Sequence, residues 1–430
     1  MICSILYYQL FLSAILLPRL VLSNNDTFCN ENTNVTAVES NQSSDLDKEL
    51  IHWLRSNGAT INEKLQIRQV DPDDPTSPKG IFATENIEEG EVICEIPMHL
   101  MIHHEGELYK NSSDCTTVEA TYKAITAEEH MLTPYAKYLL QQPRNYIPLF
   151  WSDEGYDFLL QMLGKYLPPQ NSDMYELLYT EGIDMCEAPY NDIDDAMMRH
   201  ARMMVIARSD YAYMIPFYDM FNHKSKRHHI DHEISYLKIQ DEQRSKLVAK
   251  RAVQAGNEVF NSYNLCDDCD MKEYMGTSEI LMTYGFVEKI PQLWVLRNGR
   301  LKFELDWKDE DESTNEVVVK FLIPPSKRGL AFLRAELNRL LEFGDLNRKD
   351  YGDSIPESEW NPIWQYYAAM VFAFTKALES ATETSEKVWE PSDVHWYVTD
   401  DGEEWDDKPI PDIDFEEMAQ YLGKYGFSDE

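Results

Sequence analysis

The segment DMFNH, residues 219–223, decides the fold of this chain when it is taken with three other short strings. KGIFA at residues 79–83 precedes it, and FNSY at residues 260–263 and YGFV at residues 284–287 follow it. Each string alone is common, so the information lies in their order and separation. An apolar run leads into DMFNH, and short alternating runs with a Gly-Glu turn surround KGIFA, as is typical of short β-strands.

The four strings in this order resemble the SET-domain protein methyltransferases, in particular the subfamily of the Rubisco large-subunit lysine methyltransferase. The resemblance covers roughly residues 50–290. It implies an α+β fold, with a SET domain of short β-sheets, a helical insert and then a mainly helical C-terminal lobe. It also implies that the protein transfers methyl groups from S-adenosyl-L-methionine to a lysine side chain of a protein substrate.

The resemblance implies the SET domain and the lobe that follows it, and composition and periodicity place the other expected boundaries. We expect a signal peptide at 1–23, a disordered polar linker at 24–47, a SET domain at 48–290 with its helical insert at about 115–208, a helical substrate-binding-like lobe at 291–383 and an acidic tail at 384–430. Within the lobe, residues 317–323 read as a strand, and residues 330–343 and 360–381 have apolar side chains at helical spacing.

The resemblance also assigns roles to individual residues. It makes Tyr263 the active-site hydroxyl, which orients the amine and the transferring methyl group, and it places Tyr284 in the substrate channel. The expected cofactor-binding residues are Gly80, Ile81, Phe82, Arg208, Asp219, Asn222, His223 and Phe286. A glycine allows close backbone approach to a ligand, and an arginine can grip a carboxylate with both arms of its guanidinium.

Methyl transfer from a sulfonium needs a neutral nucleophile that is aligned with the methyl group and shielded from water. Neutralising a lysine at pH 7 costs roughly 4–5 kcal/mol, and a dry aromatic channel beside a positive charge lowers that cost. A neutral histidine avoids it, so protein-histidine methylation is the alternative that the sequence leaves open. A non-catalytic SET-fold binding protein is the rival from another functional class.

The charge of the chain restricts its partners. The 430 residues carry a formal net charge of −37. Phosphate binding requires clustered basic residues, so nucleic acid is excluded as an expected partner. The negative charge favours a basic protein substrate, although solubility alone also accounts for it.

The N-terminus predicts entry into the secretory pathway, with the protein retained in the endoplasmic reticulum lumen or secreted. The apolar run at residues 2–17 is short for a membrane span and suits a signal peptide, with a signal anchor as the alternative. Acceptor sequons at Asn25, Asn34, Asn41 and Asn111 predict a glycoprotein. No stable membrane span is expected after signal removal.

Cysteine and histidine spacing predicts no metal site. The seven cysteines do not suggest a disulfide framework for so long a chain. Cys266 and Cys269 form one C-x-x-C pair, which we interpret as a local disulfide or two ordinary thiols. His228, His229 and His232 lie in a charged stretch, residues 224–233, which we interpret as a solvated loop.

Overall fold

The computed structural model describes residues 35–74, 77–103, 114–127, 133–169, 186, 190, 192, 194–210, 213–239, 242–263, 276–297, 299–309, 316–344 and 354–384. The chain divides into two units, Met1–Ser44 and Asp45–Glu430. The sheets and two hydrophobic cores lie in the second unit, and the site is built there.

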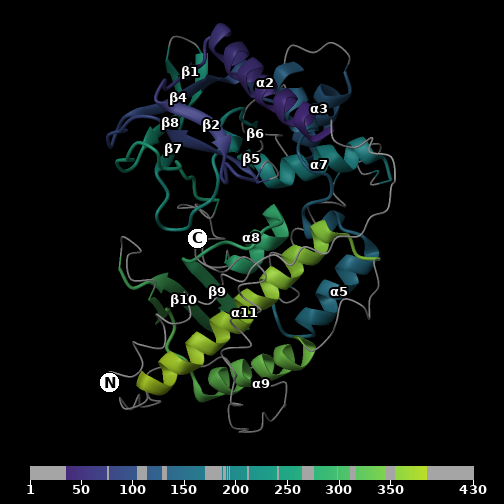
Figure 1. Ribbon diagram of the computed structural model, residues 1–430, viewed down its shortest axis with the longest axis vertical. Coiled ribbons are helices and arrows are strands. Elements are labelled where there is room, and N and C mark those ends of the chain that lie inside the picture. Colours follow the sequence, from purple (N-terminus) through teal and green to yellow (C-terminus); the bar gives the residue numbers. More distant parts are fainter. Residues whose placement is uncertain are drawn as a thin grey trace, which may run out of the picture. The chain divides into compact units, whose positions relative to one another are not determined.

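Short antiparallel sheets form the part of this unit that carries the site (Figure 1). One sheet has the strand order β1-β4-β8-β7, and smaller sheets pair β2 with β3 and β5 with β6. The strands are β1 Thr60–Ile61, β2 Leu65–Gln69, β3 Lys79–Ala83, β4 Val92–Pro97, β5 Ser209–Asp210, β6 Tyr213–Met214, β7 Ile230–Ile239 and β8 Glu242–Ala249. Buried β-branched side chains such as Ile81, Ile93 and Ile96 hold these strands on the first core.

Helices precede and separate these strands. They are α2 Val35–Ser56, α3 Asp114–Thr126, α4 Thr133–Leu140, α5 Asp153–Leu163 and α7 Ala196–Arg208. Side-chain oxygens cap two of them: Ser152 accepts from the backbone N–H of Gly155 at the start of α5, and Asp195 accepts from the first turn of α7. Helices α3, α4 and α7 contribute buried residues to the first core.

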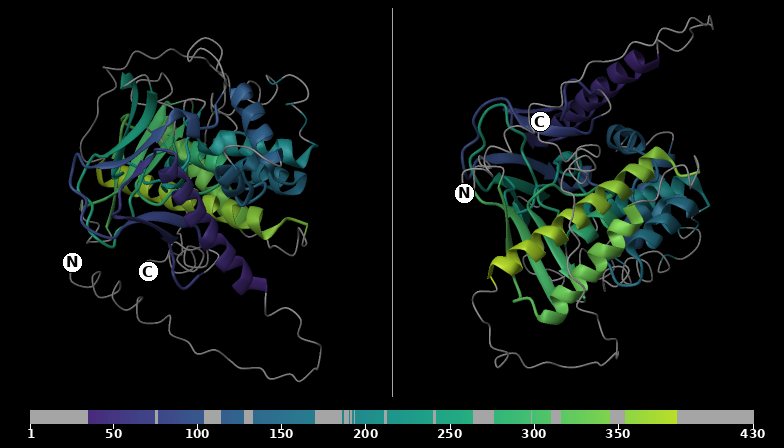
Figure 2. Two further views of the ribbon diagram at one scale, coloured as in Figure 1. Left: turned by 90° about the horizontal axis from the view of Figure 1, so that it is seen from above. Right: turned by 60° about the horizontal axis from the view of Figure 1, so that its bottom comes forward.

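A second core lies beyond the site residues. It is built by α8 Thr277–Tyr284, β9 Gln292–Leu296, β10 Leu301–Trp307, β11 Val317–Phe321, α9 Lys327–Gly344 and α11 Glu357–Thr384. The sheet order is β11-β10-β9, and α11 packs against α9, α5 and β11. Figure 2 shows α11 crossing this part of the molecule with α9 beside it.

Three observations differ from the sequence-based expectations. Helix α2 begins at Val35, so a disordered linker at 24–47 is wrong from that residue on; Leu46, Leu50 and Leu54 give the helix an apolar stripe. Strand β7 begins at Ile230, so the loop expected at 224–233 ends earlier than predicted. Strands β9 and β10 were not expected in the mainly helical lobe.

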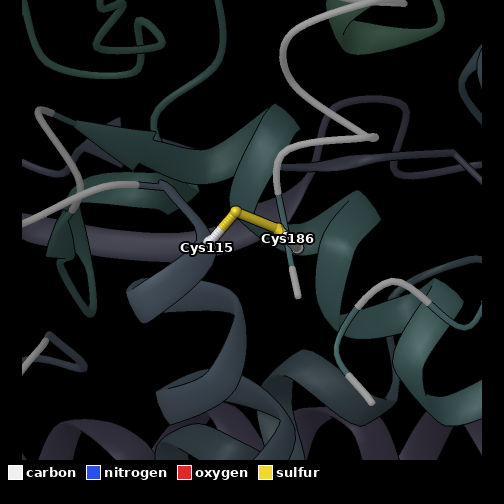
Figure 3. The surroundings of a disulfide bond; sticks show 2 residues. All are labelled: Cys115 and Cys186. Atoms are coloured by element: carbon white, nitrogen blue, oxygen red, sulfur yellow. A yellow bond between two sulfur atoms is a disulfide. The ribbon is translucent and has the colours of Figure 1, made fainter. Parts of the chain in front are cut away.

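A disulfide that the sequence did not suggest joins Cys115, in the first turn of α3, to Cys186 (Figure 3). The two cysteines are 71 residues apart in the chain, and their Cα atoms are 5.2 Å apart. The expectation of no disulfide framework is corrected to this extent. Cys266 and Cys269 lie outside the described residues, as do the signal peptide, the acidic tail and three of the four sequons, those at Asn25, Asn34 and Asn111.

Two features of the described residues concern membrane crossing and metal binding. Among those residues, no helix combines the length and the apolar character that a membrane crossing requires. In that part of the chain, no group of three or more His, Cys, Asp and Glu side chains has an arrangement suited to a metal ion. His232 instead forms an ion pair with Asp210 and hydrogen-bonds Ser245.

Candidate active site

The DMFNH and FNSY segments meet side by side, although they are far apart in the sequence. Phe217 has φ 72°, a left-handed conformation that turns the chain into the short helix η4, Tyr218–Met220. After it, the N–H of Asn261 donates to the carbonyl of Asn222 at 2.9 Å, and the N–H of Lys224 donates to the carbonyl of Asn261 at 2.8 Å. This parallel bridge pairs His223 with Asn261. The peptide groups of His223 itself therefore point away from Asn261.

Gly80 lies beside the side chain of Asn222. Asn222 donates through Nδ2 to the Lys79 carbonyl at 3.0 Å and to Glu258 Oε1 at 2.6 Å. A Cβ at Gly80 would clash with the Glu258 carboxylate and would lie 2.9 Å from Asn222 Nδ2. Burial raises the pKa of Glu258 above its usual value. Glycine is therefore required here by the contact between strand β3 and an Asn–Glu pair.

The ring of His223 is almost fully buried, and both of its nitrogens contact protein groups. The backbone N–H of Tyr263 donates to Nδ1 at 3.0 Å, and Nε2 lies 2.9 Å from Glu288 Oε2. Because Nδ1 is an acceptor, the ring proton is on Nε2 and is donated to Glu288. Both ring nitrogens of His223 are thus engaged by protein partners.

Aromatic rings from three segments converge at this point. The ring centroid of Tyr263 lies 4.5 Å from that of Tyr284, 6.2 Å from that of Phe286 and 5.1 Å from that of His223. The Tyr263 hydroxyl donates to the carbonyl of Phe221 at 2.8 Å. Burial raises the pKa of both Tyr263 and Tyr284, and the nearby charge of Asp210 adds to the effect at Tyr284. The cluster is therefore a neutral aromatic surface at neutral pH.

Arg208 and Asp219 form a buried pair beside the aromatic cluster. Arg208 donates to the Asp219 carbonyl at 2.7 Å, and its Nη1 lies 3.6 Å from Asp219 Oδ2. It also donates to Gln142 Oε1 at 2.6 Å, while Tyr135 donates to Asp219 Oδ2 at 3.0 Å. Burial raises the pKa of Asp219 to about 6 despite the neighbouring guanidinium. Both predicted cofactor residues are thus near the site and are held by protein partners.

The remaining predicted residues contribute backbone and packing. Ile81 is fully buried in the first core, and its carbonyl accepts from the N–H of Val259 at 2.7 Å. The guanidinium of Arg68 lies 3.8 Å from the ring centroid of Phe82. The ammonium of Lys224, which follows His223, lies 5.5 Å from the ring centroid of Phe260. The side chain of Ile81 therefore supports strand β3 from the core side.

Sequence reasoning missed several residues that complete this site. Tyr146 packs its backbone against Gly285, whose φ is 75° and whose Cβ-free surface permits that approach. Glu258 and Glu288 hold Asn222 and His223, respectively. In the sequence, only their closeness to the strings could have pointed to these glutamates. Glu258 stands two residues before FNSY and Glu288 directly follows YGFV, but neither spacing indicates which residue the carboxylate contacts.

Comparisons with known proteins place this geometry in a family. Residues 79–264 match the family model described as SET domain. No curated protein matches the chain as a relative.

Similar solved structures include the SET domain of LSMT bound to lysine and AdoHcy, at 15% identity over 81% of this chain and 86% of that chain, with a TM-score of 0.44. Rubisco LSMT bound to sinefungin and monomethyllysine covers 80% and 85% at 15% identity and a TM-score of 0.42. Rubisco LSMT bound to AdoMet covers the same shares at 16% identity and a TM-score of 0.41. These likenesses are too weak to assign an activity.

The family match confirms the SET resemblance and the expected α+β SET fold. It contains KGIFA, DMFNH and FNSY, which the structure brings together around Gly80, His223 and Tyr263. YGFV lies beyond its end, and that string completes the aromatic cluster. Residues 79–264 are therefore a SET domain.

Proposed function

We propose that this protein is an S-adenosyl-L-methionine-dependent protein-lysine N-methyltransferase. The observation that carries the proposal is the convergence of Tyr263, Tyr284 and Phe286 around His223, at a SET domain that contains Tyr263 and His223. Aromatic faces attract cationic sulfonium and ammonium groups, and a water-poor surface lowers the cost of a neutral amine. Lysine is the preferred target because a chain with a net charge of −37 attracts basic protein segments.

The residues present fit the cofactor. In the part of the chain that the structure describes, Asp219 Oδ1 and Arg208 Nε are buried without a hydrogen-bond partner, so this pair has unused polar capacity. Arg208, Asn222 and the peptide groups of His223 would hold the cofactor, whose sulfonium supplies the methyl group. Glu258 fills the space beside Gly80, so a ligand that approaches Gly80 displaces that carboxylate.

Tyr263 orients the nucleophile in this proposal. Its hydroxyl donates to the Phe221 carbonyl, so the oxygen lone pairs are left to accept an N–H of the substrate amine. Because burial raises its pKa, the hydroxyl remains protonated at neutral pH and does not act as a general base. Its contribution is alignment, which operates when reacting atoms are held in line.

Calorimetry and product analysis test the function. The purified protein should bind S-adenosyl-L-methionine and should transfer its labelled methyl group to lysine in proteins of a cell lysate. If the label is recovered on histidine, the protein is a histidine methyltransferase and the proposal of lysine methylation is wrong. A well-folded sample that binds no cofactor would identify the chain as a non-catalytic SET-fold binding protein.

We also propose that the protein enters the secretory pathway and is glycosylated. The apolar residues 2–17 and the sequons support this proposal, and the Cys115–Cys186 disulfide adds to it because disulfides persist in oxidising compartments. Expression in a eukaryotic host should give a glycosidase-sensitive mobility shift and a Cys115–Cys186 peptide in non-reducing mass spectrometry. A cytosolic, unshifted product with reduced Cys115 would contradict the proposal.

A further inference from the structure

Glu288 holds a buried carboxylate just beyond the SET match. Its side chain is 2% exposed. Thr277 Oγ1 donates to one carboxylate oxygen at 2.6 Å, and Ser225 Oγ donates to the other at 2.6 Å. His223 Nε2 is the third donor, at 2.9 Å. Burying a carboxylate is costly unless hydrogen-bond donors satisfy it. The three donor side chains are therefore held in orientations that point toward Glu288.

His223 transmits this arrangement to the site. Glu288 accepts the proton on Nε2, which leaves Nδ1 as an acceptor for the backbone N–H of Tyr263 at 3.0 Å. The opposite tautomer would place a proton against that N–H and would leave Glu288 without its ring donor. The tautomer of one histidine therefore fixes the backbone of the residue that carries the site hydroxyl.

The second core contains a carboxylate in a comparable setting without a site nearby. Glu359 of α11 is 5% exposed and accepts from the backbone N–H of Ser152 at 3.0 Å and from its hydroxyl at 2.5 Å. It joins α11 to the start of α5. A purely structural role for Glu288 would give it the same phenotype as Glu359, which makes Glu359 a matched control.

We propose that Glu288 is a positioning residue for methyl transfer, acting through His223 on Tyr263. The proposal rests on the proposed function of the site. Glu288 touches neither substrate nor cofactor in this scheme. It sets the histidine tautomer, and the tautomer sets the place and direction of the Tyr263 hydroxyl, which donates to the Phe221 carbonyl at 2.8 Å.

The test compares Glu288→Ala, Glu288→Gln and Glu359→Gln in the full chain. Carboxylates that orient a metal-bound histidine contribute about 10–100-fold to activity, and a drop of about tenfold or more is expected in the single-turnover rate of Glu288→Ala. Affinity for S-adenosyl-L-methionine should remain within about threefold of the parent, a change of less than 1 kcal/mol. Glu288→Gln should retain more activity because its amide oxygen can still accept from His223, and Glu359→Gln should lose stability without losing rate.

A second readout separates this proposal from the proposed function. Nitrogen-15 NMR of the folded proteins should show His223 in the Nε2–H tautomer in the parent and a mixture of tautomers in Glu288→Ala, with a shifted Tyr263 amide. Failure of the parent to methylate would reject the proposed function and leave the NMR result to decide the link. An unchanged tautomer and Tyr263 amide, or an unchanged single-turnover rate in an active protein, would overturn the positioning role.

Discussion

The two hydrophobic cores of this chain differ in composition and in their distance from the candidate site. The first core packs short strands and helices beside the polar pair of Arg208 and Asp219, whose carboxylate accepts a hydrogen bond from Tyr135 of that core. The second core is rich in aromatic rings that contact one another, such as Phe158 and Trp360, whose centroids are 5.1 Å apart. Burial of large rings is strongly favourable, whereas buried charges return little net stability.

This difference indicates that, within one unit, the first region carries the site and the second core stabilises the fold. In the first region, an isolated parallel bridge between His223 and Asn261, outside the named strands, brings two site segments together. Helix α8 connects the regions: Leu281 and Met282 pack into the second core, and Tyr284 at its end belongs to the aromatic site. The second core thus anchors one side of the site without contributing its chemistry.

Trp364→Ala should give the largest effect and should confine it to stability. Trp364 is 2% exposed and contacts the rings of Trp360 and Tyr367 at centroid distances of 5.5 and 5.0 Å. Truncation should lower the free energy of unfolding by about 3–5 kcal/mol, measured by chemical denaturation. Val318→Ala, at an exposed position of β11, should change it by less than about 0.5 kcal/mol. Loss of cofactor affinity in still-folded Trp364→Ala would contradict the division between the cores.

Tyr263→Phe should give the next largest effect, and its effect on turnover should exceed a small loss of stability that its control variant shares. Loss of a well-placed transition-state contact costs about 10²–10³ in rate. The matched control is Tyr366→Phe in the second core, whose hydroxyl also donates to a backbone carbonyl, that of Pro168 at 3.2 Å. Each variant should lose about 0.5–1.5 kcal/mol of stability with its hydrogen bond. Single-turnover kinetics and thermal melting separate the two, and normal turnover in Tyr263→Phe would remove it from the site.

Local patterns in the sequence predicted several regular elements that follow the strings. Residues 317–323 correspond to β11, and residues 330–343 and 360–381 correspond to α9 and α11. A helical period repeats over many residues, so a helix can be predicted without knowing which segments it packs against. Strand β10 alternates apolar and polar side chains, a strand signal that the expectation of a mainly helical lobe did not take into account. Strand β9 has no such alternation and forms through pairing with β10.

Contacts between distant segments were not predictable from those patterns. The sequence placed α5 in one helical insert with α3 and α7, yet Phe158 and Leu159 of α5 pack into the second core. The Glu288–His223 contact and the Cys115–Cys186 disulfide could not be predicted either, because the sequence around each residue does not indicate which distant residue it contacts. The convergence of Tyr263, Tyr284 and Phe286 was anticipated only through the family resemblance.

Asp219→Asn should produce a smaller effect that depends on pH. The folded-state pKa of Asp219 is raised from 3.8 to about 6 by burial, so the folded chain retains a proton that the unfolded chain loses between these values. The contribution of this group to stability is full below pH 4 and is lost as pH rises through 6, by up to about 3 kcal/mol. Urea denaturation at pH 4 and pH 7 should show this loss in the parent and not in Asp219→Asn.

An exposed substitution supplies the baseline for that experiment. Asp153→Asn in the first turn of α5 alters one exposed carboxylate and should leave the pH dependence of the parent nearly unchanged. If Asp219→Asn and the parent have parallel pH profiles, Arg208 keeps Asp219 ionised in the folded protein and the attraction within the pair exceeds the cost of burial.

Asn222→Ala should give the smallest effect, and it should appear in cofactor affinity. The Asn222 amide joins strand β3 to Glu258, so its removal leaves the Lys79 carbonyl and a buried carboxylate without a donor. The expected loss is about 1–2 kcal/mol, or roughly five- to thirtyfold in Kd for S-adenosyl-L-methionine by calorimetry. Asn57→Ala removes an exposed amide that bonds only within its own helix end, to the Trp53 carbonyl, and should leave Kd unchanged. Equal Kd values for both variants would show that Asn222 braces the first core without holding the cofactor, and the site would then depend on Arg208 and the peptide groups of His223.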